Sequence, residues 1–246
     1  MSLRAAARSI APFLTLVAAC GSPQTPGAHP HDMSAAQHES MAGKESATAQ
    51  THSAQYNPDA AVQTERCTRG GVANTGVDGA CWTTASNPTA THLEEAQKHH
   101  KMAADHRAAS QALRDAEARV CVGISESDRD MSPFDHREDI ASVEPLTVNV
   151  SSGKGQYART EGVVVTLRAV PGMTAQWLQR LVDCHLARNA ALGHDVPEMA
   201  YCPLVPKGAT ARVSGTDAGF AVVIRSDDSQ TAQEILRRGR ALASRP

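Results

Sequence analysis

Apolar residues are spread unevenly along the 246 positions of the chain. After an apolar run at residues 10–19, the stretch from 21 to 61 contains no Val, Ile, Leu, Phe or Trp. Such a stretch buries too little apolar surface to offset the loss of chain entropy. We therefore expect residues 20–64 to form a disordered tether, and residues 65–144 and 145–246 to hold the folded structure.

The stretch 92–120 predicts one long helix, because it has no Gly or Pro and is rich in Ala, Glu, Gln, Lys and Arg. Thr91 and Glu94 have the spacing of a capping box. The less polar positions recur every three or four residues, from His92, Ala96 and His99 through Ala103, His106 and Ser110 to Leu113 and Val120. This stripe is polar where the helix begins and apolar where it ends.

Residues 145–246 predict an α+β domain. Apolar, β-branched runs indicate strands at 146–150 and 162–170 and a hairpin at 211–225, with helices at 174–192 and 229–242. The order of these elements predicts helices packed on one face of an antiparallel sheet. It resembles a ferredoxin-like two-layer sandwich, a likeness of fold that many unrelated functions share.

The first twenty residues have the features of an export signal. Arg4 and Arg8 precede an apolar run that is too short to span a bilayer. The sequence Val17-Ala18-Ala19-Cys20 resembles the lipobox of bacterial lipoproteins. The resemblance implies a signal peptide at 1–19, lipid on Cys20 and attachment to a membrane. Gly21 in place of Asp resembles lipoproteins sorted to the outer membrane, which implies a cell-envelope protein that faces the periplasm.

Charge and cysteine content fit export. The net charge is −2, and removal of Arg4 and Arg8 makes it about −4, so there is no basic field for nucleic acid. Disulfides form beyond the inner membrane. The five cysteines after Cys20 allow 5 × 3 = 15 ways of forming two disulfides, which the sequence leaves open. By proximity we favour Cys67–Cys81 and Cys184–Cys202, which leaves Cys121 unpaired.

The tether holds the first candidate metal ligands. These are His29, His31, Met33, His38, Met41 and His52. They resemble the His/Met-rich segments of periplasmic copper-handling proteins, which implies copper as the ion. Imidazole binds Cu(II) and Zn(II), and thioether suits Cu(I). The alternative is a plain polar spacer.

The long helix holds the second candidate. His92, His99 and His106 are seven residues apart, about 10 Å along the axis, which is too far for two of them to bind one ion. His99, Met102 and His106 have the closer spacings that one copper or zinc site would need. The alternative is a solvated helix face.

Two further groups favour structural roles. The acidic loop Asp128, Asp130, Asp135, His136, Glu138 and Asp139 lacks the glycine of a calcium-binding loop, and Arg129 and Arg137 would neutralise part of it. Cys184 and His185 are adjacent on a helix and point about 100° apart, so they do not form a nucleophile–base pair. No serine elbow, phosphate loop, HExxH or CxxC occurs, which disfavours an enzyme.

Together these patterns predict a non-enzymatic, lipid-anchored envelope protein that binds a metal ion, copper first and zinc second. The competing hypothesis is an interaction or scaffold lipoprotein that docks to an envelope complex. The stretch 92–145 also resembles one found in proteobacterial lipoproteins, a likeness that implies no activity.

Overall fold

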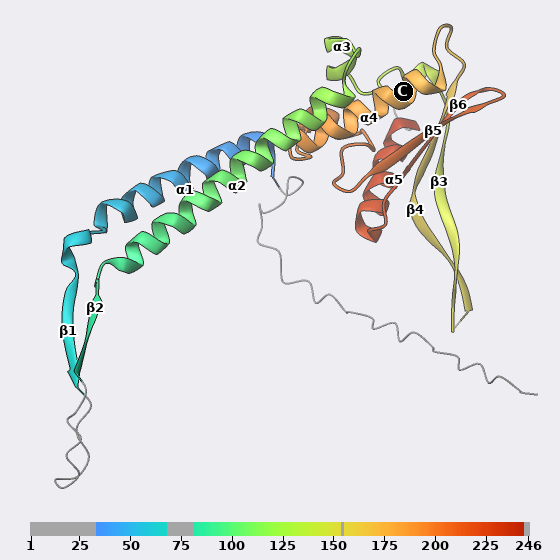
Figure 1. Ribbon diagram of the computed structural model, residues 1–246. Coiled ribbons are helices and arrows are strands. Elements are labelled where there is room, and N and C mark those ends of the chain that lie inside the picture. Colours follow the sequence, from blue (N-terminus) through green and yellow to red (C-terminus); the bar gives the residue numbers. More distant parts are fainter. Residues whose placement is uncertain (1–32, 68–80, 154, 244–246) are drawn as a thin grey trace, which may run out of the picture.

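An elongated helical arm projects from an α+β head in the computed structural model, which describes residues 33–67, 81–153 and 155–243 (Figure 1). The arm consists of α1 (Ala35–Gln55) and α2 (Ala90–Val120), which run side by side. At its far end a 3-10 turn (Pro58–Ala60) leads into a ribbon of β1 (Val62–Cys67) and β2 (Cys81–Ser86). The predicted signal peptide, Cys20, His29 and His31 lie outside the described residues.

Helix α1 corrects, for residues 35–55, the expectation that residues 20–64 form a disordered tether. Ser34 caps the helix: its side chain accepts a hydrogen bond from the Gln37 backbone, and the Gln37 side chain accepts one from the Ser34 backbone. The buried residues of α1 are three alanines and a histidine, at Ala35, His38, Ala42 and Ala49. The lack of large apolar residues therefore did not prevent folding, because alanine packs against a second helix.

Helix α2 confirms the long helix predicted for 92–120. It begins at Ala90, with Thr89 as the capping position, so the capping box predicted at Thr91 and Glu94 is wrong. The residues that α2 buries are Ala96, Ala103, Ser110 and Leu113, all within the predicted stripe. No helix among the described residues is long and apolar enough to cross a membrane.

The ribbon at the end of the arm is closed by a disulfide. Strands β1 and β2 are antiparallel, and their register places Cys67 opposite Cys81. The predicted Cys67–Cys81 bond is confirmed. Every residue of both strands is exposed, so the ribbon packs on nothing in the described chain.

The head contains one four-stranded antiparallel sheet. Its elements are β3 (Ile140–Ser152), β4 (Gly155–Arg168), α4 (Ala175–Ala191), β5 (Thr210–Thr216), β6 (Gly219–Arg225) and α5 (Ser229–Ala243), with a 3-10 turn at Pro197–Met199. The strand order is β3-β4-β6-β5. The α+β class and the helices at α4 and α5 are confirmed. The ferredoxin-like arrangement is not confirmed, because the sheet consists of two consecutive hairpins, β3-β4 and β5-β6, each followed by one helix.

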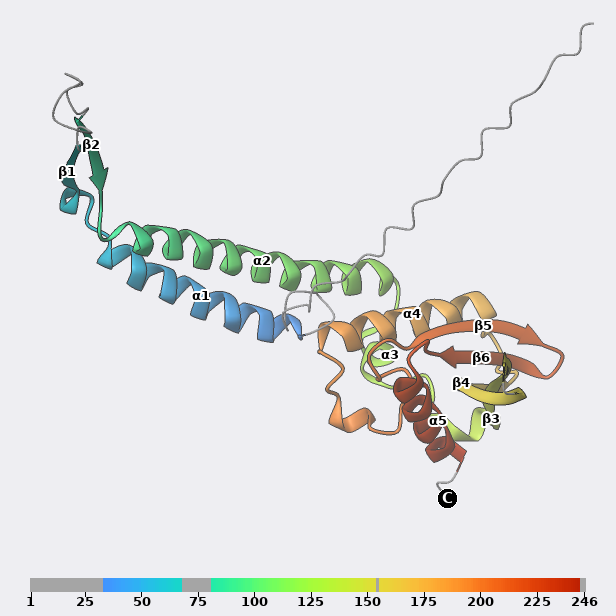
Figure 2. The ribbon, with the colours of Figure 1, turned by 90° about the horizontal axis from the view of Figure 1, so that it is seen from below.

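Helices α4 and α5 cover one face of the sheet (Figure 2). Alternate residues of β4 (Val163, Val165 and Leu167) point into this core, while their neighbours are less buried. Thr174 caps α4 by accepting from the Trp177 backbone. Gly239 lets α5 approach the sheet closely, since a Cβ there would lie 2.8 Å from a Val163 methyl group.

The head begins earlier in the chain than the boundary predicted at residue 145. Ile124 and Phe134 are buried in its core, and the acidic loop contains α3 (Glu126–Asp130) and a 3-10 turn at Arg137–Asp139. The predicted Cys184–Cys202 disulfide is wrong, because Cys184 is bonded to Cys121. Cys202 is a free, buried thiol whose pKa is raised by burial.

The base of the arm is fixed to the head by a covalent bond and by a close backbone contact. The Cys121–Cys184 disulfide links the end of α2 to α4. Gly193, just after α4, has a φ of +72° and lies against the start of α1: a Cβ at Gly193 would be 2.9 Å from the Ser34 nitrogen. Glycine is therefore required at this contact.

Candidate metal centre at the helix seam

The contact between α1 and α2, here called the seam, has a regular spacing. Its positions alternate between steps of three and four residues, as in a coiled coil. On α1 they are Ala35, His38, Ala42, Glu45, Ala49 and His52, and on α2 they are His92, Ala96, His99, Ala103, His106 and Ser110. The helices run antiparallel, so each layer of the seam pairs an early residue of α1 with a late residue of α2.

Every second layer of the seam is polar. The Nδ1 atoms of His38 and His106 are 2.9 Å apart, and those of His52 and His92 are 3.2 Å apart. Between these two layers, His99 Nδ1 lies 2.5 Å from a carboxylate oxygen of Glu45. Each polar layer therefore contains one histidine of α2 bonded directly to one side chain of α1.

Small residues fill the layers between. The Ser110 hydroxyl donates to the Ala35 carbonyl at 2.9 Å. By the same register Ala42 lies opposite Ala103, and Ala49 opposite Ala96; all four are buried. Because alanine extends no further than Cβ, the two backbones approach closely, and in the polar layers the His38 ring is buried while the other imidazole rings are partly buried.

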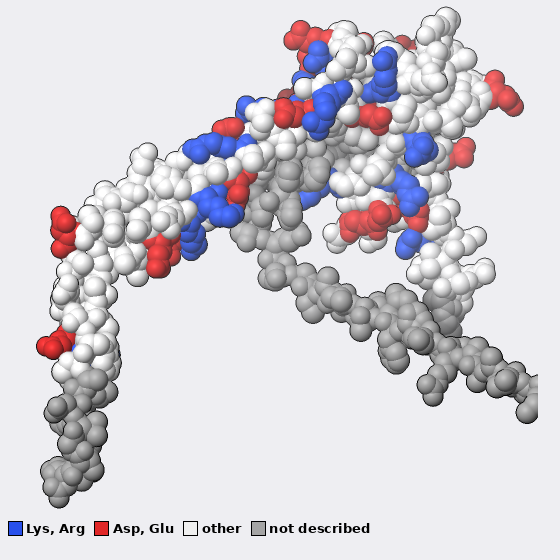
Figure 3. Space-filling view, in the orientation of Figure 1, with Lys and Arg blue, Asp and Glu red and all other residues white. Residues whose placement is uncertain are grey.

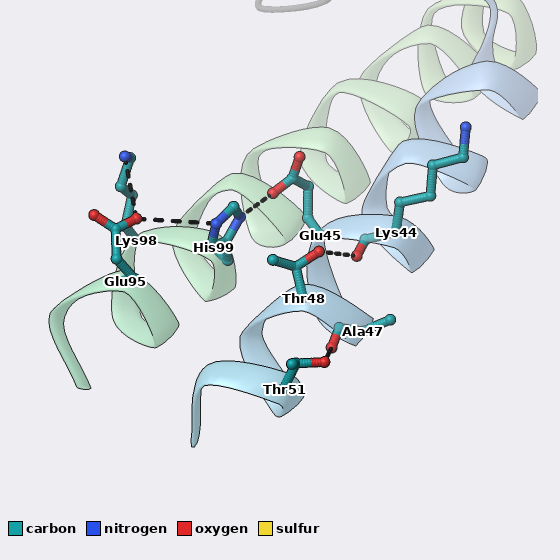
Figure 4. A network of polar contacts seen from close by, with 8 residues as sticks. All are labelled: Lys44, Glu45, Ala47, Thr48, Thr51, Glu95, Lys98 and His99. Atoms are coloured by element: carbon teal, nitrogen blue, oxygen red, sulfur yellow. Dashed lines mark hydrogen bonds and ion pairs between the residues drawn. The ribbon is translucent and has the colours of Figure 1, made fainter. Parts of the chain in front are cut away.

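The middle layer is flanked by a second carboxylate. Figure 4 shows His99 of α2 between Glu45, which comes from α1, and Glu95, one turn earlier on α2. The Glu95 carboxylate is 4.0 Å from His99 Nε2 and also pairs with Lys98. Both ring nitrogens of His99 therefore face a carboxylate. In each outer layer, by contrast, the Nδ1 atoms of two imidazoles face each other.

The two outer layers have the spacing of paired metal ligands. Two nitrogens bound at about 2.05 Å to one ion are about 2.9 Å apart at a right angle and about 3.3 Å apart at the tetrahedral angle. The observed distances of 2.9 and 3.2 Å lie in this range. Each layer offers two donors, because within the described residues the only cluster of three His, Cys, Asp or Glu ligands is Glu65, Cys67 and Cys81.

That cluster lacks free thiolates, because Cys67 and Cys81 are joined in the ribbon disulfide. The sulfur atoms would have to be reduced before they could bind an ion. The histidine layers need no such change, so they are the better candidate ligands.

The structure unites the two separate candidates from the sequence. His38 and His52, assigned to the tether, lie against His106 and His92 of the long helix, across sequence separations of 68 and 40 residues. His99 and His106 are in different layers, so they do not come together around Met102 as expected. Met33 and Met41 lie outside the layers.

Sequence reasoning missed Glu45 entirely. The signal that could have found it is the alternation of three- and four-residue steps through residues 35–52, which matches the stripe of the long helix. The composition of such an alanine-rich stripe is also that of a polar tether, so the helix was not predicted.

The acidic loop takes part in ion pairs, but through Arg188, whereas Arg137, one of the two arginines expected to neutralise it, donates to the Ala241 and Leu242 carbonyls. Arg188 bonds to Asp130 at 2.5 Å and to Glu117 of α2 at 3.1 Å. The Tyr201 hydroxyl donates to Asp135 at 2.6 Å, and burial together with this bond raises the pKa of Tyr201 to about 12. On the face drawn in Figure 3, positive and negative side chains are mixed along both arm and head.

Cys184 is a buried half-cystine, the role predicted for it, although its partner is Cys121. Next to it, His185 is buried, and its Nε2 lies 2.9 Å from the Asp128 carbonyl oxygen. Burial lowers the pKa of His185. Cys121 and Cys184 are joined in a disulfide, so neither provides a thiolate beside the His185 imidazole.

Comparison with known proteins gives no relative: no family model matches the chain, and no curated protein or solved structure is similar to it.

Proposed function

We propose that this protein is a lipid-anchored envelope protein that binds transition-metal ions along its helical arm. The observation that carries the proposal is the seam, where two histidine-bearing segments far apart in sequence meet in regularly spaced pairs. In a plain spacer, the polar side chains at every seventh position of α1, His38, Glu45 and His52, would not be expected to meet a histidine of α2 in each case.

The anchor is the second part of the proposal. It rests on the lipobox-like sequence Val17-Ala18-Ala19-Cys20, which would attach lipid to Cys20. Only the 13 residues 21–33 then separate the lipid from the capping residue Ser34 (33 − 20 = 13). Fully extended, they reach at most about 45 Å, which keeps the base of the arm near the membrane surface.

Calorimetric titration tests the metal part. Cu(II) and then Zn(II) are added to the soluble chain from residue 21, and the proposal expects saturable binding in the micromolar range or tighter. A chain that takes up neither ion would contradict it. For the anchor, the Cys20→Ala variant of the full precursor is expected to leave the membrane fraction of the host, and retention there would contradict lipidation.

The second candidate function is that of an interaction or scaffold lipoprotein. The ribbon at the end of the arm favours it, because Val62 and Trp82 are about half exposed there, at 54% and 47%. Helix α2 has 31 residues, which places this ribbon about 46 Å from the base of the arm. Crosslinking from Trp82 in intact cells, lost in a Trp82→Ala variant, would support a docking role.

A further inference from the structure

The outer polar layers of the seam stand out from the rest of the molecule, because each brings two imidazoles from different helices into contact. We infer that His38 with His106, and His52 with His92, are two separate two-nitrogen sites for Cu(II), and that each bound ion staples α1 to α2. This inference rests on the proposed function and names its sites, its ion class and its effect on the arm.

The donor set determines the class of ion. Neither outer layer contains a thiolate or thioether, the ligands that select Cu(I). Imidazole nitrogens suit Cu(II) and Zn(II), and for a given site of this kind Cu(II) binds more tightly. Two protein donors leave the remaining positions of the ion to water or small anions, so the ion stays exchangeable.

Binding requires a change of tautomer within each pair. At present one ring donates its Nδ1 proton to the Nδ1 of the other. Both Nδ1 atoms must be proton-free to bind the ion, so the donated proton moves to Nε2 of the same ring. The ion then lies to one side of the line between the two nitrogens, about 2.05 Å from each, so both rings must turn their lone pairs toward it.

Because little apolar area is buried between α1 and α2, a bound ion would have a large effect on the stability of the arm. The residues buried between α1 and α2 are mainly alanines, which contribute little apolar area compared with the head. An ion that bonds to both helices therefore adds a large share of the free energy that holds α1 in place. The middle layer is not one of the proposed Cu(II) sites, because His99 is already bonded to Glu45 and faces Glu95.

The test is a Cu(II) titration of the chain from residue 21 and of its variants, with nitrogen coupling followed by electron paramagnetic resonance. The expected result is two equivalents, with one lost in His106→Ala, one in His92→Ala and both in the double variant. His100→Ala is the matched control, since His100 is exposed on the same helix and should bind as the parent does. His106→Gln, with helix content checked by circular dichroism, repeats the test with a larger, polar side chain.

The outcomes separate the inference from the function on which it rests. If the parent chain binds no Cu(II), both fail. If it binds two ions that persist in the His92→Ala/His106→Ala double variant but disappear in His29→Ala/His31→Ala, the proposed function stands and the seam assignment is overturned. Hydrogen exchange tests the staple: Cu(II) should slow the amides of α1 at least tenfold, and unchanged exchange with bound ion would overturn that part.

Discussion

The arm and the head are held together by different kinds of side chain. Between α1 and α2 the buried residues are alanines and polar pairs, with Leu113 as the one large apolar residue close to the head. The head buries Phe134 and a continuous set of Val, Leu and Ile from its sheet and helices. The free energy of the head therefore follows from apolar area, while that of the arm depends on close backbone approach and on the polar layers.

Each region contains one of the two tryptophans of the chain, Trp82 in the ribbon and Trp177 on α4. A Trp82→Phe background therefore reports unfolding of the head alone, and Trp177→Phe that of the ribbon at the end of the arm. These two backgrounds allow the contrast to be tested region by region.

The largest effect is expected from Phe134→Ala. Phe134 is fully buried in the head, so its loss should lower the free energy of unfolding by about 3–5 kcal/mol. Urea denaturation followed by Trp177 fluorescence measures this change. The exposed Tyr157→Ala serves as a control with little expected effect, and a Phe134→Ala transition as stable as that of the parent would contradict the core assignment.

Removal of the Cys121–Cys184 disulfide should come next. The bond closes a loop of 63 residues, and the entropy of that loop in the unfolded chain gives a loss of about 4 kcal/mol, toward the top of the usual 2–4 kcal/mol. The Cys121→Ala/Cys184→Ala variant is compared with Cys67→Ala/Cys81→Ala, which should destabilise only the ribbon. Equal effects of the two double variants on the Trp177 signal would argue against the assigned pairing.

A smaller effect is expected from overpacking the seam with Ala103→Leu. Ala103 is fully buried between the helices, and the added side chain should cost about 1–3 kcal/mol by separating α1 from α2. Hydrogen exchange along α1 should accelerate while the head stays unchanged. Ala104→Leu, at the exposed neighbouring position, is the matched control. Slow exchange retained in Ala103→Leu would show that the seam is not closely packed.

The smallest expected effect is a loss of stability of the head at acidic pH. Burial lowers the pKa of His185, so the folded head binds this proton less readily than the unfolded chain does. The stability that follows is present above the ordinary pKa of about 6.5 and is lost as the pH falls toward the lowered value. One proton gives a slope of at most about 1.4 kcal/mol per pH unit.

In the Trp82→Phe background, His185→Gln should flatten this slope between pH 6.5 and 5. His136→Gln is the control, because His136 is exposed and bonds only to the exposed Glu138. The same slope in His185→Gln as in the parent would assign the acid sensitivity to another group.

The head was predictable from the sequence because its core uses the strongest signals. The apolar, β-branched run at residues 162–170 correctly indicated a strand, although β4 begins earlier, at Gly155, and the Thr174 cap correctly indicated α4. Helix α1 was missed, since its buried face consists of alanine and histidine, residue types that also fill polar linkers. The Cys121–Cys184 bond was missed because closeness in sequence does not decide which cysteines meet when a long helix returns to the head.

For the same reason, the sequence predicted the histidines of the candidate site but not their arrangement. Its histidines were identified in two segments, but their meeting depends on α1 being a helix with the correct register. Without that register, nothing in the sequence indicated that Glu45 contacts a histidine.

The covalent link at the base of the arm has a mechanical consequence. With α2 bonded to α4 through Cys121–Cys184 and with Ser34 pressed against Gly193, neither helix of the arm has a free joint where it meets the head. A pull on the ribbon would act on the head as a torque with a lever of about 46 Å, the length of the 31-residue helix. The arm would turn the head rather than fold against it.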